Sequence, residues 1–207
     1  SIIPRWFNEN ICIANYAESG ETTTSFMSEK RLDKVLSMIK KGDYVFVEFG
    51  HNDEKDKGEK AGAFLNYADN IRVYIAKAKQ KGANPIIVSP TARRSFSGGK
   101  ATNTHGDYPK AAQEVAESEG VPFIDITQMT MDMLSTFGAE DSKKLYVHYP
   151  AGSYSDTALK DDTHFNPFGA FEIAKCVIMG LKDIKSPIVD NLRDDWKDFD
   201  PKKPDNW

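Results

Sequence analysis

The 207 residues include 27 Lys and Arg and 31 Asp and Glu, which gives a net charge of −4 at pH 7. With 40% hydrophobic and 28% charged residues, the composition is that of a globular protein and excludes a fibrous or disordered chain. The basic pairs at 40–41, 93–94 and 143–144 stand in mixed-charge surroundings, and we expect them on a solvated surface, so nucleic acid is not an expected partner. No apolar run approaches the roughly 20 residues that cross a bilayer, so no membrane partner is expected either.

Apolar runs and amphipathic stretches alternate along the first half of the chain. Residues 11–14 are a short apolar run that predicts a buried strand, and residues 32–39 have apolar side chains at helical spacing. Residues 44–49 are aromatic and β-branched and predict a central strand. Helical spacing returns at 63–81, and residues 86–88 predict a third strand.

The second half continues this alternation after a long polar loop. Residues 91–106 are rich in Gly, Ser, Thr and Asn, and loops of that length in a compact domain are often functional. The predicted elements that follow are a helix at 107–119, a strand at 121–126, a helix at 127–134, a largely irregular stretch at 138–160 and a last helix opened by Pro167.

Repeated strand-then-helix units predict an α/β fold, namely a three-layer α/β/α sandwich around a parallel sheet. No internal repeat divides the chain, so we expect one domain over residues 1–207, with 193–207 as a C-terminal extension on the surface. Cys12 and Cys176 lie in apolar runs and are expected to be buried free thiols, which fix no compartment.

Asp161 and His164 stand three residues apart just before the last predicted helix. This spacing lets the carboxylate accept a hydrogen bond from one imidazole nitrogen while the other nitrogen faces a reacting hydroxyl. The pair can therefore act as a general base with its orienting carboxylate. The alternative is that His164 only caps the helix.

Asn52 follows a predicted buried strand, within the sequence Gly-His-Asn-Asp. Its amide can donate to an oxyanion that develops during acyl transfer, and the backbone N–H of Gly20 can add a second donor. Ligands of open parallel sheets bind beyond the carboxyl ends of the strands, which is where these loops lie. An ordinary Asx turn is the alternative for Asn52.

Three sequence blocks together resemble the SGNH hydrolase superfamily. Gly20, the Gly50-x-Asn52-Asp53 sequence and the Asp161-x-x-His164 pair match, in order, its blocks II, III and V. The chain looks most like the rhamnogalacturonan acetylesterase branch, carbohydrate esterase family 12, and this resemblance spans residues 2–205. The stretches that match this branch are 50–53, 105–109 and 161–165.

The resemblance implies a flavodoxin-like parallel sheet and a secreted or periplasmic serine esterase that removes acetyl groups from pectic polysaccharide, with no cofactor and no metal. The residues it assigns to the reaction are the base His164, its orienting carboxylate Asp161 and the oxyanion donors Asn52 and Gly20. The resemblance leaves two roles possible for three further residues, namely substrate binding or support of the site. These residues are His51, His105 and Tyr108.

One block of the family pattern has no counterpart, because no Gly-Asp-Ser sequence occurs in the chain. Residues 2–7 resemble the segment that normally follows it, so we expect the nucleophilic serine and the first strand on an absent N-terminal segment. That strand normally lies between those predicted at 11–14 and 44–49. The isolated chain is therefore expected to hydrolyse no ester and to need this segment for stable folding. Ser19, beside Gly20, is the one internal substitute for the serine.

Two other functions remain open at this point. A metal-dependent hydrolase would use the nitrogen and oxygen ligands of His51, Asp53, Asp161 and His164. A non-catalytic carbohydrate-binding relative would keep the fold without hydrolysis. Aromatic side chains in loops suit stacking on sugars, although they more often pack inward. The aromatic residues in question are Phe96, Tyr108 and Tyr154.

Overall fold

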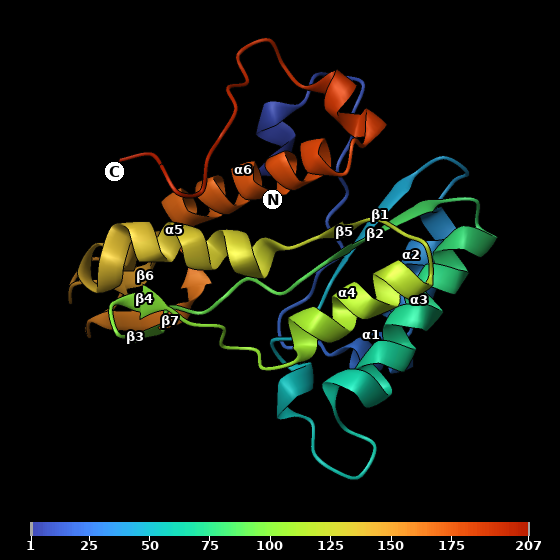
Figure 1. The fold of residues 1–207 in the computed structure, drawn as a ribbon, viewed down its shortest axis with the longest axis horizontal. Helices are drawn as coiled ribbons and strands as arrows, with labels where there is room; N and C mark the ends of the chain where they lie inside the picture. The colour runs from blue at the N-terminus through green and yellow to red at the C-terminus, as the bar shows by residue number, and fades with distance from the viewer. Residues whose placement is uncertain (1, 207) are drawn as a thin grey trace. The chain divides into compact units, whose positions relative to one another are not determined.

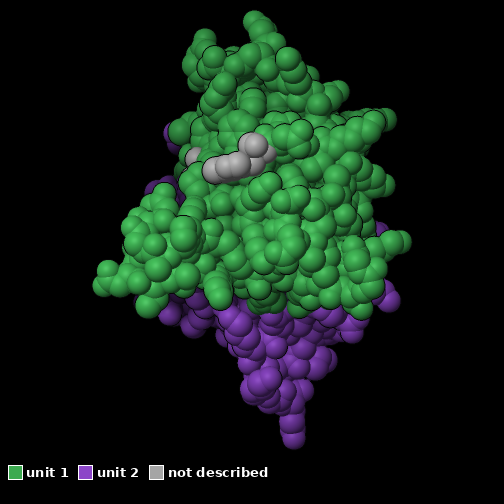
Figure 2. Space-filling view, turned by 90° about the vertical axis from the view of Figure 1, so that its left-hand side faces the viewer, with its two compact units in different colours: residues 1–14, 91–104, 126–207 green, residues 15–90, 105–125 purple. Residues whose placement is uncertain are grey.

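The computed structural model describes residues 2–206 and divides the chain into two compact units, which Figure 1 shows as a ribbon and Figure 2 in separate colours. Of the described residues, unit 1 comprises 2–14, 91–104 and 126–206, and unit 2 comprises 15–90 and 105–125. Over residues 2–206, no helix combines the length and the apolar character that crossing a bilayer requires.

Unit 2 contains a parallel sheet with the strand order β1-β2-β5. Strand β1 (Tyr44–Glu48) pairs in parallel with β2 (Asn84–Val88), and β2 pairs in parallel with β5 (Phe123–Ile124). The middle strand β2 is buried from its second residue onward, as a strand with neighbours on both sides should be. The predicted α/β class with a parallel sheet is confirmed.

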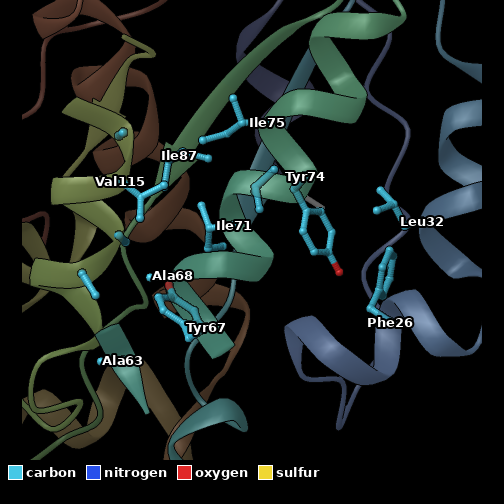
Figure 3. Packing of buried hydrophobic residues seen from close by; sticks show 14 of the residues in the cluster. Phe26, Leu32, Ala63, Tyr67, Ala68, Ile71, Tyr74, Ile75, Ile87 and Val115 are labelled. Carbon is cyan, nitrogen blue, oxygen red and sulfur yellow. The ribbon is translucent and has the colours of Figure 1, made fainter. Parts of the chain in front are cut away.

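The helices of unit 2 build one core against this sheet. In α3, Ile71 and Ile75 are fully buried at i, i+4 spacing and point toward Ile87 of β2, whereas Tyr74 points toward Phe26 (Figure 3). The helices predicted at 32–39, 63–81 and 107–119 are confirmed, and a short helix, α1, was not predicted. The helical elements of unit 2 are α1 (Thr23–Ser28), α2 (Arg31–Met38), the 3-10 turn η2 (Asp53–Lys55), the π-helix η3 (Ala63–Tyr67), α3 (Ala68–Gln80) and α4 (Tyr108–Ser118).

Unit 1 combines two long helices with two antiparallel hairpins. Helix α5 (Ile126–Asp141) packs against α6 (Pro167–Asp183), and Pro167 occupies the first turn of α6 as predicted. The hairpins are β3 (Phe96–Ser97) with β4 (Lys100–Ala101), and β6 (Tyr146–Tyr149) with β7 (Leu159–Phe165). The 3-10 turns are η1 (Ile3–Trp6), η4 (Ser142–Leu145) and η5 (Pro187–Asn191).

Residues 11–14 do not form the predicted strand. They have no regular structure, their side chains are partly or fully exposed, and no strand of the described chain pairs with them. An apolar run becomes a strand only where a neighbour takes its backbone hydrogen bonds. Cys12 is accordingly exposed, contrary to expectation, whereas Cys176 is buried, and burial raises the pKa of its thiol to about 12.

The stretch at 138–160 is more ordered than predicted. It holds the end of α5, which runs past residue 134, the turn η4 and strand β6. The loop at 91–106 contains the short β3–β4 hairpin, and the strand predicted at 121–126 is reduced to the two residues of β5. Strand β5 pairs with β2 and strand β6 pairs with β7, and local periodicity does not report such pairing.

Most residues of the C-terminal segment 193–206 are exposed, and the segment contacts α6 through Met179 and Lys182. The backbone N–H of Arg193 donates to the Trp6 carbonyl at 2.9 Å, and Phe199 is buried. The buried ammonium of Lys175 pairs with Glu172 at 2.7 Å and with Asp205 of the segment. Apolar burial and ion pairs therefore hold this extension in place.

Candidate functional site

The Asp161–His164 pair lies where the register of the β6–β7 hairpin shifts, an irregular stretch of β7 that we call the bulge. Tyr146 is opposite Phe165 and His148 is opposite Lys160, so residues 161–164 of β7 have only residue 147 of β6 facing them. A bulge of this kind releases residues from the ladder and re-aims their side chains. The pair predicted in a loop before the last helix thus sits near the end of a strand.

Asp161 orients the imidazole of His164 directly. Its Oδ2 is 2.7 Å from His164 Nδ1, and its Oδ1 accepts from the backbone N–H groups of Thr163 at 2.7 Å and of His164 at 2.9 Å. Burial alone would raise the pKa of Asp161, but the hydrogen bonds from these two N–H groups and from the imidazole lower it. An ionised carboxylate needs a donor, so Nδ1 carries the proton and Nε2 is the basic nitrogen. The His164 side chain is 70% exposed, which leaves Nε2 accessible.

The next residue, Asp162, is held from two sides. Its Oδ1 accepts from Arg94 Nη1 at 2.8 Å and lies 2.8 Å from His148 Nε2, and its carbonyl accepts from the Arg94 backbone N–H at 2.8 Å. Burial would raise the pKa of Asp162, but the hydrogen bonds from His148 and Arg94 lower it. The bulge is therefore anchored beside the Asp161–His164 pair.

Sequence reasoning missed this anchor. Only 12% of the Arg94 side chain is exposed, so the expectation that the pair at 93–94 is solvated surface is wrong for Arg94. Its Nε donates to Ser142 Oγ at 3.1 Å, and its Nη2 contacts the Ala139 carbonyl. The sequence did contain a signal for this anchor. Asp162, the second acid of the Asp-Asp-Thr-His sequence, is a negative charge beside the predicted site, and such a charge needs a cationic partner.

The end of β7 is fixed to α6 by Asn166. Its Oδ1 accepts from the N–H of Gly169 at 2.9 Å, and its Nδ2 donates to the carbonyls of Lys144 at 2.8 Å and Tyr146 at 2.9 Å. Asn166 is the N-cap of α6, so the alternative that His164 caps this helix is wrong. A Cβ added at Gly169 would lie 1.9 Å from the Leu145 carbonyl oxygen, so only glycine fits there.

In unit 2, Asn52 lies next to the segment that contains Gly20. Asn52 Nδ2 donates to the Glu21 carbonyl at 3.2 Å, and its Oδ1 accepts from Lys55 Nζ at 2.8 Å. Because an ammonium only donates, the contact with Lys55 assigns the orientation of the amide. The Asn52 side chain caps no turn, so the Asx-turn alternative is not observed. Gly20 is exposed with a φ of +87°, a left-handed conformation that glycine adopts without strain.

Asp53 joins the Asn52 loop to the start of α1. Its Oδ1 accepts from the N–H of Thr23 at 2.8 Å and from the Thr23 hydroxyl at 2.6 Å, and its Oδ2 has no hydrogen-bond partner among residues 2–206. Burial raises the pKa of Asp53 despite the bonds from Thr23. In the same range, no three His, Cys, Asp or Glu side chains are grouped so that they could hold a metal ion.

The other motif residues of unit 2 pack beneath this loop. His105 is fully buried, with Nδ1 2.9 Å from Glu54 Oε2, and its ring centroid is 4.4 Å from that of His51. The Tyr108 hydroxyl donates to the Asp53 carbonyl at 3.0 Å. Burial favours support of the loop over substrate contact for His105, whereas the His51 side chain is 24% exposed.

The structure thus brings the predicted residues together in two groups, one in each unit. The group in unit 1 is Asp161 and His164, and the group in unit 2 is Gly20, Asn52, His51, His105 and Tyr108.

Comparison with known proteins identifies the family. Residues 2–170 match the GDSL-like lipase/acylhydrolase family. The chain is 34% identical over 189 residues to the rhamnogalacturonan acetylesterase RhgT of Bacillus subtilis (strain 168), covering 90% of this chain and 81% of that protein. It is 32% identical over 186 residues to the probable rhamnogalacturonan acetylesterase YesY of the same organism, covering 89% and 82%.

A solved structure agrees with this assignment. The crystal structure of the YxiM protein of Bacillus subtilis matches with a TM-score of 0.77 at 25% identity, over 90% of this chain. The chain spans half the length of that protein. The superfamily predicted from the three sequence blocks is confirmed, and the chain belongs to the GDSL-like lipase/acylhydrolase (SGNH) family.

Proposed function

We propose that this chain provides the general base and the oxyanion donors of a serine esterase that removes O-acetyl groups from carbohydrate. The observation that carries the proposal is the 2.7 Å contact between His164 Nδ1 and Asp161 Oδ2, with the ring otherwise exposed. The names of RhgT and YesY favour an acetylated pectic rhamnogalacturonan as the substrate. Because such a polymer is too large to enter a cell, we place the enzyme outside the cytoplasm. The two units would together form one esterase domain.

In the proposed reaction, His164 Nε2 takes the proton of a serine hydroxyl while the serine oxygen attacks the acetyl carbonyl. Asp161 stabilises the imidazolium that forms. The N–H of Gly20 and the second amide hydrogen of Asn52 donate to the carbonyl oxygen as it becomes negative, and each such donor is worth about 10²- to 10³-fold in rate.

The tetrahedral intermediate then collapses, and His164 returns its proton to the sugar oxygen that leaves. The acetyl group remains on the serine. Water, deprotonated by the same imidazole, attacks the acetyl-serine, and the imidazolium gives that proton to the serine oxygen as the bond to it breaks and acetate leaves. Each half-reaction thus needs one basic nitrogen held in one tautomer, which the Asp161 carboxylate provides.

The nucleophilic serine would come from a segment outside these 207 residues, since they contain no Gly-Asp-Ser sequence. Among residues 2–206, β1 pairs only with β2, and Tyr44 and Phe46 on β1 are 37% and 42% exposed. This edge offers backbone groups to which a further strand can pair. Ser19, exposed beside Gly20, is the alternative nucleophile within the chain.

We assign support of the Asn52 loop to His105 and Tyr108, because one is fully buried and the other bonds the loop backbone. His51 is the motif residue placed to contact substrate, because part of its ring remains exposed.

The test compares this chain alone with the complete enzyme, meaning the same chain joined to the segment encoded directly upstream. Acetate release is measured from acetylated rhamnogalacturonan oligosaccharides and from an aryl acetate, and the nucleophile is identified with a serine-directed phosphonate. The complete enzyme should hydrolyse both esters in the presence of a chelator and be labelled on the Gly-Asp-Ser serine. Hydrolysis by the chain alone would contradict an external serine and point to Ser19. A folded complete enzyme that neither hydrolyses nor becomes labelled would favour the non-catalytic relative.

A further inference from the structure

The tip of the β6–β7 hairpin, residues 150–158, presents an exposed aromatic side chain. Tyr154 is 75% exposed, more than any other large hydrophobic residue of the described chain. Its ring centroid lies 4.5 Å from that of Tyr149, with a tilt of 49° between the rings. Tyr149 therefore supports one side of Tyr154, and the other side faces solvent. A large aromatic ring left exposed on a folded surface is typical of a binding site.

The tip holds this ring on an ordered loop. The N–H of Gly152 donates to the Ser155 carbonyl at 2.8 Å, and the N–H of Thr157 donates to Ser155 Oγ at 3.2 Å. Gly152 takes a φ of +84°, which closes the turn. A loop fixed by its own hydrogen bonds loses little entropy when a ligand binds. Its remaining polar side chains are Ser153, Asp156 and Thr157, which suit the hydroxyl groups of a sugar.

The aromatic pair and the catalytic pair share one hairpin. Tyr149 is directly opposite Leu159, so the two side chains lie on the same face, and Asp161 follows on that face two residues later. From Leu159 to His164 the strand advances five residues, at most about 17 Å at roughly 3.3 Å per residue. A substrate of several sugar residues can span a distance of this order and contact both places.

The other two loop aromatics expected to stack on sugars are engaged elsewhere. The Arg94 guanidinium lies over the Phe96 ring, 5.8 Å from its centroid. The Tyr108 hydroxyl is bonded to Asp53, and its ring packs edge-on against Tyr67 at 5.0 Å. Phe96 and Tyr108 are half-buried, whereas Tyr154 is exposed.

We propose that Tyr154, supported by Tyr149, is a sugar-binding platform. It holds a pyranose ring of the polysaccharide near the sugar residue whose acetyl ester is cleaved. The proposal rests on the proposed carbohydrate esterase function and adds a second point of attachment to it. The C–H groups of the sugar would lie on the free face of the Tyr154 ring, and the polar side chains of the tip would meet its hydroxyl groups.

The first experiment measures binding, which requires no turnover. A deacetylated rhamnogalacturonan oligosaccharide is titrated into the complete enzyme by calorimetry. Tyr154→Ala should raise the Kd about 3- to 10-fold, the range of a lost aromatic contact, and Tyr154→Phe should stay within about twofold because it keeps the ring. Phe64→Ala is the control, since Phe64 is another exposed ring, 47% exposed, in unit 2.

The second experiment compares substrates of different size. In Tyr154→Ala, the kcat/KM for the acetylated oligosaccharide relative to that for an aryl acetate should fall by the same factor as binding. An unchanged Kd in Tyr154→Ala, an equal loss in Phe64→Ala, or absence of binding by the wild type would overturn the platform. Failure of the proposed esterase function would appear separately, as absence of aryl acetate hydrolysis by the wild type.

Discussion

Asp161→Asn and Asp162→Asn make the same chemical change at adjacent positions. We predict a large loss of kcat in Asp161→Asn and a small one in Asp162→Asn. In Asp161→Asn, the amide oxygen can still accept from the backbone N–H groups of Thr163 and His164, which Asp161 binds at 2.7 and 2.9 Å, so the bulge should keep its shape. The amide NH2 then faces His164 Nδ1, which must become an acceptor. The ring proton moves to Nε2, and the basic nitrogen is lost.

The expected loss in Asp161→Asn is about 10³- to 10⁴-fold in kcat, the size of effect seen when a catalytic histidine is held in the wrong tautomer. At 1.36 kcal/mol per factor of ten, this corresponds to about 4 to 5.5 kcal/mol of activation free energy. Asp162→Asn keeps an oxygen for Arg94 and does not touch the His164 ring. It should lower kcat by less than about tenfold and stability by about 1 kcal/mol, because Asp162 is 48% exposed and solvent screens its ion pairs.

Two assays on the complete enzyme separate the variants. Steady-state acetate release from an aryl acetate gives kcat, and ¹⁵N NMR of the histidine rings reports which nitrogen of His164 carries the proton. The tautomer should switch in Asp161→Asn and stay as in wild type in Asp162→Asn. A kcat for Asp161→Asn within tenfold of wild type, or an equal loss in both variants, would refute the orienting role of Asp161.

Three further predictions concern the scaffold of the site. Gly169→Ala should lower the free energy of unfolding by about 2 kcal/mol or more, because its Cβ would meet the Leu145 carbonyl at 1.9 Å; an unchanged urea midpoint contradicts this. Arg94→Lys should lower the Tm and kcat of the complete enzyme together, because an ammonium cannot bind Asp162 and Ser142 as the guanidinium fork does; a variant like wild type in both would argue against the anchor. The pKa values of Asp161 and Asp162 are lowered in the folded chain. The stability that these two carboxylates contribute is therefore fully present above the pKa of an unfolded Asp, about 4, and is lost as the pH falls through their lower pKa values in the folded chain. Urea midpoints measured from pH 7 to 3 should therefore fall less steeply in Asp162→Asn than in wild type, and equal slopes would oppose this assignment.

The strands and helices that sequence periodicity predicted are those whose pattern is local. Strand β2 is buried almost throughout and reads as a continuous apolar run, and α3 buries Ile71 and Ile75 at helical spacing. Strand β7 was not predicted, because its exposure alternates along a mostly polar sequence and its stability comes from pairing with β6. Residues 11–14 show the reverse error, since an apolar run without a paired neighbour remained irregular.

In the candidate site, too, the sequence predicted the contacts between neighbouring residues and missed those between residues far apart in the chain. The spacing of Asp161 and His164 is short enough to be read as a hydrogen-bonded pair, and the structure shows that contact. The contact between Arg94 and Asp162 joins residues 68 positions apart, so no spacing rule reports it. Sequence therefore indicated the chemical groups, whereas the bulge that re-aims them and the anchor that fixes it follow from the three-dimensional pairing.

In the proposed function, the His164 imidazole activates a serine. The most direct measurement is the rate at which a serine-directed phosphonate inactivates the complete enzyme and its His164→Gln variant, with circular dichroism to show that both are folded. A positioned general base predicts that the variant reacts about 10²- to 10⁴-fold more slowly. Equal rates of inactivation in the two folded proteins would contradict it.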